Sequence, residues 1–74
     1  METQPSNKII IIDDEVDLCK AIERIMVKDG FEVTSANTGK DGLTLAETFK
    51  PDVVLLDLFL PDTNGLFVLK QLKE

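Results

Sequence analysis

Two short apolar runs in this chain each end directly in an aspartate. The first run, residues 9–12, consists of four isoleucines and leads into Asp13 and Asp14. The second run, residues 53–56, leads into Asp57. Unbroken β-branched or aliphatic runs of this length are typical of strands buried in a parallel sheet, and open α/β folds place their ligand sites at the carboxyl ends of such strands. The chain is therefore predicted to be an α/β protein with acidic side chains gathered at one edge of its sheet.

The three carboxylates predict a metal site. Like charges brought within a few ångströms in a partly dry cleft repel one another strongly, and a hard divalent cation relieves that repulsion. Asp13 and Asp14 also have a simpler interpretation as helix caps, and Asp57 as the end of a strand. A carboxylate that follows an apolar strand still requires a partner, which favours the metal site.

The pattern between the two runs predicts a helix and a further strand. Apolar residues at three- and four-residue spacing predict an amphipathic helix that begins near Asp14 or Glu15 and stops at Gly30. The alternation of apolar and polar residues over 31–36 predicts an edge strand with one buried face.

A second helix is predicted over about residues 40–48. Thr38 and Asp41 resemble a capping box at its start, with Asp in place of the usual Glu. Pro51 prevents the helix from continuing and biases Lys50 toward extended geometry. The chain is then expected to enter the third strand.

A third amphipathic helix is predicted after Asn64 and Gly65, and we expect it to be still in progress at Glu74. Asp62 and Asn64 are expected to form the preceding turn rather than to bind metal. The predicted order of elements is β-α-β-α-β-α. Short connections and right-handed crossovers favour a parallel sheet with helices on both faces.

Size and composition restrict the possible functions. The 74 residues allow one domain, which we place at residues 8–74 after a polar, flexible tail over 1–7 without signal-peptide features. The net charge of −6 argues against nucleic acid or an anionic membrane as a partner of this segment. No apolar stretch approaches the ~18 residues that span a bilayer. Cys19 is the single cysteine, which excludes an internal disulfide and favours a cytoplasmic setting.

Residues 8–74 resemble the receiver domain of bacterial two-component response regulators. The resemblance depends on the acidic pair after the first strand, on the lone Asp57 after the third, and on the turn Leu-Pro-Asp-x-x-Gly over 60–65, all at the expected separations. It implies a flavodoxin-like fold whose parallel three-stranded sheet has the order 2-1-3. It also implies that the chain covers the amino-terminal part of a receiver and lacks the last two β-α units of the full fold.

The resemblance implies phosphoryl transfer, for which a protein supplies mainly alignment and charge neutralisation. Asp57 would accept a phosphoryl group from a sensor histidine kinase, with Mg²⁺ as cofactor. Asp14 would bind the metal directly and Asp13 mainly through water, while Asp57 and the backbone carbonyl of Phe59 would complete the protein ligands. The resemblance thus implies a phosphoacceptor rather than a turnover enzyme.

Two alternative functions stay open from the sequence. The chain could be a non-phosphorylating interaction module that self-associates through the exposed edge of its third strand, because an open apolar edge invites pairing with another chain. A Mg²⁺-dependent phosphohydrolase is the weaker alternative. Such enzymes commonly carry a second Asp two residues after the nucleophile, where this chain has Phe59.

Overall fold

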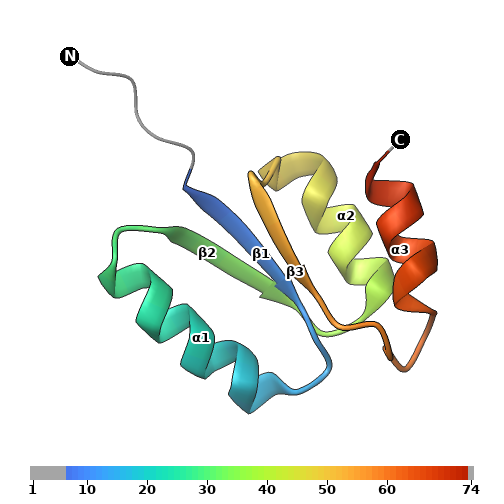
Figure 1. Cartoon of the computed structure of the whole chain (residues 1–74), viewed down its shortest axis with the longest axis horizontal. Helices are drawn as coiled ribbons and strands as arrows, with labels where there is room; N and C mark the ends of the chain where they lie inside the picture. The colour runs from blue at the N-terminus through green and yellow to red at the C-terminus, as the bar shows by residue number, and fades with distance from the viewer. Residues whose placement is uncertain (1–6, 74) are drawn as a thin grey trace.

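The computed structural model describes residues 7–73 of the chain (Figure 1). The strands are β1 (Lys8–Ile12), β2 (Glu32–Ala36) and β3 (Val53–Leu56). The helices are α1 (Val16–Lys28), α2 (Gly39–Phe49) and α3 (Gly65–Leu72). This order confirms the predicted β-α-β-α-β-α arrangement. The expected continuation of the third helix to Glu74 lies outside the described residues.

The three strands form one parallel sheet in the order β2-β1-β3, as predicted. Ile12, the last residue of β1, pairs with Ala36 of β2 and with Leu56 of β3. Because both neighbours run parallel to β1 and end in register with it, the residues that follow β1 and β3 leave the sheet at the same edge.

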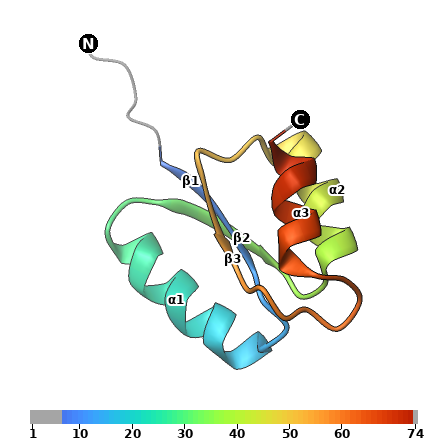
Figure 2. The same cartoon turned by 45° about the vertical axis from the view of Figure 1, so that its right-hand side comes forward.

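Helices cover both faces of the sheet, α1 on one side and α2 with α3 on the other (Figures 1 and 2). Successive residues of a strand point to opposite faces, and β1 uses both. Ile9 and Ile11 pack with Cys19 of α1, whereas Ile10 and Ile12 pack with Val68 of α3 and with apolar residues of α2. All four isoleucines are at most 4% exposed. Each contributes roughly 1.5–3 kcal/mol of hydrophobic stabilisation, so β1 is the centre of both halves of the core.

The ends of α1 follow the sequence prediction. The helix begins after Glu15, although no side chain caps it, and it stops before Gly30, whose φ of 93° lies in the left-handed region. At the start of α2, the Thr38 hydroxyl accepts a hydrogen bond from the Asp41 N–H at 3.1 Å, as the capping motif predicts.

The prediction for Lys50 is wrong. This residue adopts a left-handed conformation, with φ 52° and ψ 66°, instead of the extended geometry expected before Pro51. Its N–H donates to the Ala46 carbonyl oxygen at 3.1 Å, so Lys50 closes α2 as a left-handed cap. The final hydrogen bond of the helix outweighs the preference that the proline imposes.

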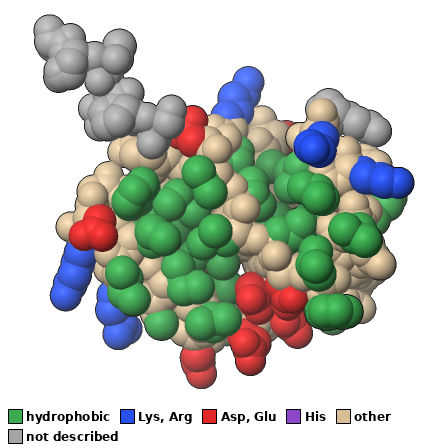
Figure 3. All heavy atoms as spheres, in the orientation of Figure 1, with side chains coloured by type: hydrophobic (Ala, Val, Ile, Leu, Met, Phe, Trp, Pro, Cys, Tyr) green, Lys and Arg blue, Asp and Glu red, His purple; other side chains and the backbone are tan. Residues whose placement is uncertain are grey.

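The β3 strand lies at the edge of the described sheet. Val53 is 48% and Leu55 is 36% exposed, because α1 packs against β1 and β2 and leaves this part of the sheet face uncovered. Hydrophobic side chains gather in a broad patch on one side of the molecule (Figure 3). Because β3 pairs only with β1 among the described strands, the edge that self-association requires is present there, while self-association itself stays a prediction.

The predicted flexible tail over 1–7 lies outside the described residues except for Asn7. The Asn7 carbonyl oxygen accepts a hydrogen bond from the Glu32 N–H at 2.8 Å, and its side-chain amide donates to the Gly30 carbonyl oxygen at 3.2 Å. Asn7 is therefore attached to the start of β2. Among the described residues, no helix has the length and apolar character needed to cross a membrane.

Candidate metal centre

The backbone at the carboxyl ends of β1 and β3 extends the sheet as far as the aspartates. The Asp57 N–H donates to the Ile12 carbonyl oxygen at 2.9 Å, and the Asp13 N–H donates to the Ala36 carbonyl oxygen at 3.0 Å. Both aspartates are consequently held by the ladder hydrogen bonds of neighbouring strands. The strand order that brings β3 next to β1 is what brings Asp57 next to the acidic pair.

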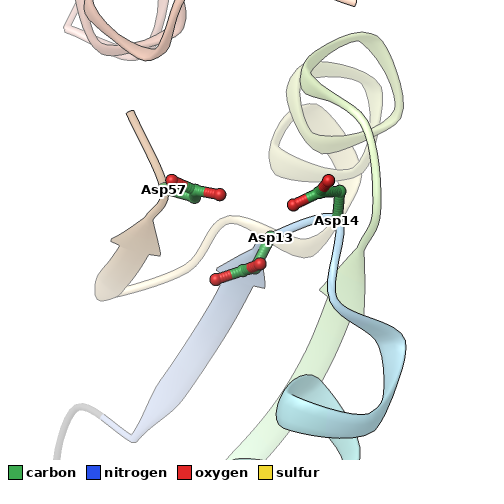
Figure 4. A group of neighbouring side chains, drawn as sticks. All are labelled: Asp13, Asp14 and Asp57. Atoms are coloured by element: carbon green, nitrogen blue, oxygen red, sulfur yellow. The ribbon is translucent and has the colours of Figure 1, made fainter. Parts of the chain in front are cut away.

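The carboxylates of Asp13, Asp14 and Asp57 converge on a common space (Figure 4). One oxygen of each lies within 4.8 Å of the others; Asp13 and Asp57 are half-buried and Asp14 is exposed. At this separation two unit charges repel by about 1 kcal/mol in water and by roughly 3 to 4 kcal/mol at an effective dielectric constant of ~20. Three oxygen donors in such an arrangement fit a hard divalent cation such as Mg²⁺. Acidic side chains also gather at the surface of this edge (Figure 3).

Local hydrogen bonds orient two of the three carboxylates. Asp13 Oδ1 accepts from the Glu15 N–H at 2.9 Å, and Asp57 Oδ1 accepts from the Phe59 N–H at 3.0 Å. Both are turns in which an aspartate binds the backbone two residues on. In each carboxylate, the second oxygen has no hydrogen-bond partner among residues 7–73, so it is available to a ligand.

Phe59 lies in the β3–α3 loop, which we define as residues 57–64, and its side chain is 87% exposed. Its N–H is bonded to Asp57, which places its backbone beside the acidic cluster. At the end of this loop, a Cβ on Gly65 would lie 2.7 Å from the Asp57 carbonyl oxygen and against the Leu58 backbone. The loop therefore returns so closely to Asp57 that only glycine fits there. The roles of Phe59 and of the three aspartates as ligands stay predictions.

Two residues that sequence reasoning did not place at the site support its loops. Asn37 donates from Nδ2 to the Asp13 carbonyl oxygen at 2.9 Å. Asp62, expected only to form a turn, accepts from the Gly39 N–H at 2.8 Å and from the Lys40 N–H at 3.0 Å. The hydrogen bonds from the backbone N–H groups of Lys40 and Gly39 lower the pKa of the Asp62 carboxyl below its usual value. The sequence gives no sign of either contact, because the two partners of each are far apart along the chain and follow no turn or helix spacing.

Asn64 behaves as its turn chemistry predicts, since its Oδ1 accepts from the Leu66 N–H at 2.7 Å at the start of α3. The fold and the acidic edge together define the class of protein: a flavodoxin-like α/β domain with carboxylates gathered at the carboxyl ends of its strands, the edge at which such folds place their ligand sites. Within that class, the chain belongs to the response regulator receiver domain family, whose sequence profile matches residues 9–74.

Individual relatives agree with this assignment. The chain is 36% identical over 69 residues to the alkaline phosphatase synthesis transcriptional regulatory protein PhoP of Bacillus subtilis, a match that covers 93% of this chain and 29% of PhoP. It is 36% identical over 68 residues to the regulatory protein AtoC of Escherichia coli, a match that covers 92% of this chain and 15% of AtoC.

Among solved structures, the chain is similar to a CheY-like response regulator receiver domain protein from Methanospirillum hungatei, with a TM-score of 0.87 at 29% identity. That match covers 92% of this chain and 54% of the other. The chain thus spans about half the length of this receiver structure and less than a third of the two curated relatives. Its three strands and three helices correspond to part of that receiver fold.

Proposed function

We propose that this chain binds Mg²⁺ and accepts a phosphoryl group on Asp57 from a sensor histidine kinase. The observation that carries the proposal is the convergence of Asp13, Asp14 and Asp57, with one oxygen of each within 4.8 Å of the others. Membership of the receiver family supports it. An acidic cluster alone would repel a phosphodonor, and bound Mg²⁺ supplies the positive charge that offsets this repulsion.

Each residue has a specific part in the proposed reaction. Asp14 would bind the metal directly, Asp13 would act mainly through water, and the Phe59 carbonyl and Asp57 would supply further oxygen ligands. The hydrogen bond from the Phe59 N–H to Asp57 Oδ1 fixes the carboxylate and leaves its other oxygen free to attack. That oxygen forms a bond to phosphorus while the bond from phosphorus to the donor breaks, and the electron pair leaves with the donor. The product is an acyl phosphate on Asp57.

Intact-mass spectrometry tests the proposal directly. The folded chain is incubated with a small donor such as acetyl phosphate, with Mg²⁺ or with a chelator. The expected result is a gain of one phosphoryl group that requires Mg²⁺ and is absent from Asp57→Asn, which keeps the acceptor for the Phe59 N–H but removes the nucleophile. Asp52→Asn, on the loop before β3, is a control that should still be labelled. An unchanged mass in a folded wild-type sample with Mg²⁺ would defeat the proposal.

The partner and the cellular location follow from the same proposal. A histidine kinase is the expected donor, and the cytoplasm is the expected compartment. The buried free thiol of Cys19 is compatible with a reducing environment.

The exposed β3 edge favours a second candidate function, a non-phosphorylating module that self-associates. Val53 and Leu55 are exposed on a strand without a further neighbour in the described sheet. Sedimentation of the 74-residue chain tests this: association that Val53→Lys abolishes and Asp57→Ala leaves intact would support it, while a monomer at high micromolar concentration would argue against it.

A further inference from the structure

The two loops proposed to carry the metal ligands are both attached to one segment, the β2–α2 turn, defined here as residues 37–40. This segment includes the first two residues of α2, Gly39 and Lys40. One attachment is through Asn37 to the loop after β1, and the other is through Asp62 of the β3–α3 loop to Gly39 and Lys40. No direct hydrogen bond between the acidic pair and the β3–α3 loop is found among residues 7–73. The β2–α2 turn is therefore a common support for both halves of the site.

On one side of this support, the Asp13 backbone is bonded at both ends. Its N–H donates to the Ala36 carbonyl oxygen at 3.0 Å, and its carbonyl oxygen accepts from Asn37 Nδ2 at 2.9 Å. The Cys19 thiol approaches the same carbonyl oxygen at 3.5 Å. The amide of Asn37 thus holds the Asp13 carbonyl at the point where the chain leaves β1 and continues to Asp14.

On the other side, Asp62 binds two consecutive backbone N–H groups at the start of α2, those of Gly39 and Lys40. A carboxylate at the positive end of a helix that accepts two hydrogen bonds is a strong attachment. The loop and the helix also approach closely, because a Cβ on Gly39 would overlap Thr63 and lie 2.9 Å from Val68. The β3–α3 loop is consequently seated on α2 by charge, hydrogen bonding and shape.

We propose that Asn37 and Asp62 are positioning residues, through which the β2–α2 turn sets the distance between the acidic pair and the Phe59 carbonyl. In naming Mg²⁺ as the ligand, this inference rests on the proposed function. Mg²⁺ requires near-ideal octahedral geometry, so ligands on two independently moving loops bind it less well than ligands on a shared support. Groups that orient metal ligands typically change metal affinity by roughly 10- to 100-fold when they are removed.

Titration of Mg²⁺ into the 74-residue chain, followed by calorimetry, tests the proposal in four variants. Asp62→Ala and Asn37→Ala should each weaken Mg²⁺ binding by about 10-fold. Asp62→Asn should lie between Asp62→Ala and the wild type, because its amide oxygen still accepts from the helix but carries no charge. Asp41→Ala removes a charge from an exposed position at the same end of α2, and it should change the affinity less than about 2-fold.

Ile22→Val separates positioning from stability. It removes one methylene from the core between α1 and the sheet and lowers the Tm, and it lies on a helix that carries neither Asn37 nor Asp62. We expect its Mg²⁺ affinity to stay at the wild-type value. If Ile22→Val weakens Mg²⁺ binding as much as Asp62→Ala does, Asn37 and Asp62 merely stabilise the fold and the proposal is overturned.

A metal-free measurement keeps the inference distinct from the proposed function. Backbone ¹⁵N relaxation of the Phe59 amide should show its order parameter falling from about 0.85 toward about 0.6 in Asp62→Ala, and staying at the wild-type value in Asp41→Ala. Should the wild type fail to bind Mg²⁺, the proposed function fails and the positioning role is judged on this measurement alone. An unchanged Phe59 order parameter in folded Asp62→Ala would refute it.

Discussion

Replacing Asp13 with asparagine is expected to stabilise the metal-free protein while it weakens Mg²⁺ binding. The new amide keeps a side-chain oxygen to accept the Glu15 N–H, so the substitution removes charge without removing the local hydrogen bond. What it relieves is repulsion from Asp14 and Asp57, whose oxygens lie within 4.8 Å. Residues that hold a ligand commonly reduce stability in its absence, and this cluster gives that general trade-off a specific electrostatic cause.

The expected magnitude follows from the geometry. Each repulsion lies between about 1 kcal/mol in water and roughly 3 to 4 kcal/mol at an effective dielectric constant of ~20. Because Asp13 is only half-buried and counter-ions screen its neighbours, we expect a net gain of about 1–2 kcal/mol in the free energy of unfolding. For a domain of this size that gain raises the Tm by roughly 6–13 °C.

Thermal unfolding followed by far-UV circular dichroism measures this gain in a chelator and again with Mg²⁺. In the chelator, the variant should unfold at a higher temperature than the wild type, and the difference should shrink in ~1 M salt, where the screening length is about 3 Å. With Mg²⁺ at about 100 times its Kd, the wild type should gain about 2.7 kcal/mol, and the variant should gain much less.

Glu47→Gln is the matched control, because it removes one negative charge from an exposed position on α2, on an element outside the acidic cluster. It should change the Tm little in either condition. A metal-free Asp13→Asn protein that is no more stable than the wild type would refute the view that the three carboxylates repel one another.

Three further predictions concern single side chains. Hydrogen bonds lower the pKa of the Asp62 carboxyl in the folded state. The stability that this shift contributes is therefore present above the unfolded pKa of ~3.9 and is lost as the pH falls through the lower, folded pKa. Asp62→Asn should make the Tm depend less steeply on pH in this acid range. Cys19 is 1% exposed and burial raises the pKa of its thiol, so a thiol reagent should label it slowly in the native state and rapidly in denaturant. Fast native labelling would contradict that burial. Gly65→Ala would place a Cβ against the Leu58 backbone and 2.7 Å from the Asp57 carbonyl oxygen, which should cost about 1–3 kcal/mol of stability in urea unfolding.

The elements of this fold could be predicted from the sequence because their signals are local. The four isoleucines of β1 are all buried, and β3 has the bounds of its apolar run. Gly30 ends α1 with a positive φ, as a residue without a side chain does most readily. Lys50 shows where a local rule failed: the preference imposed by Pro51 competed with the last hydrogen bond of α2, and sequence alone could not weigh one against the other.

The acidic cluster could be predicted only in part from the sequence. That Asp13, Asp14 and Asp57 follow strands is evident from the sequence, but their convergence depends on β3 pairing with β1 rather than with β2. The strand order came from a family resemblance and not from hydrophobic periodicity, which determines the faces of a strand but not its neighbours.

Only the tertiary structure connected the supports of the site. Asn37 and Asp62 reach partners 24 and 22 to 23 residues away in sequence, across loops whose approach is set by helix packing on the sheet. Burial and backbone preference are properties of short segments, so the amino-acid sequence by itself determined the strands, the helices and the acidic ends of β1 and β3. A hydrogen bond between two loops depends on the positions of both loops, which are fixed only when α2 and α3 pack together against β1.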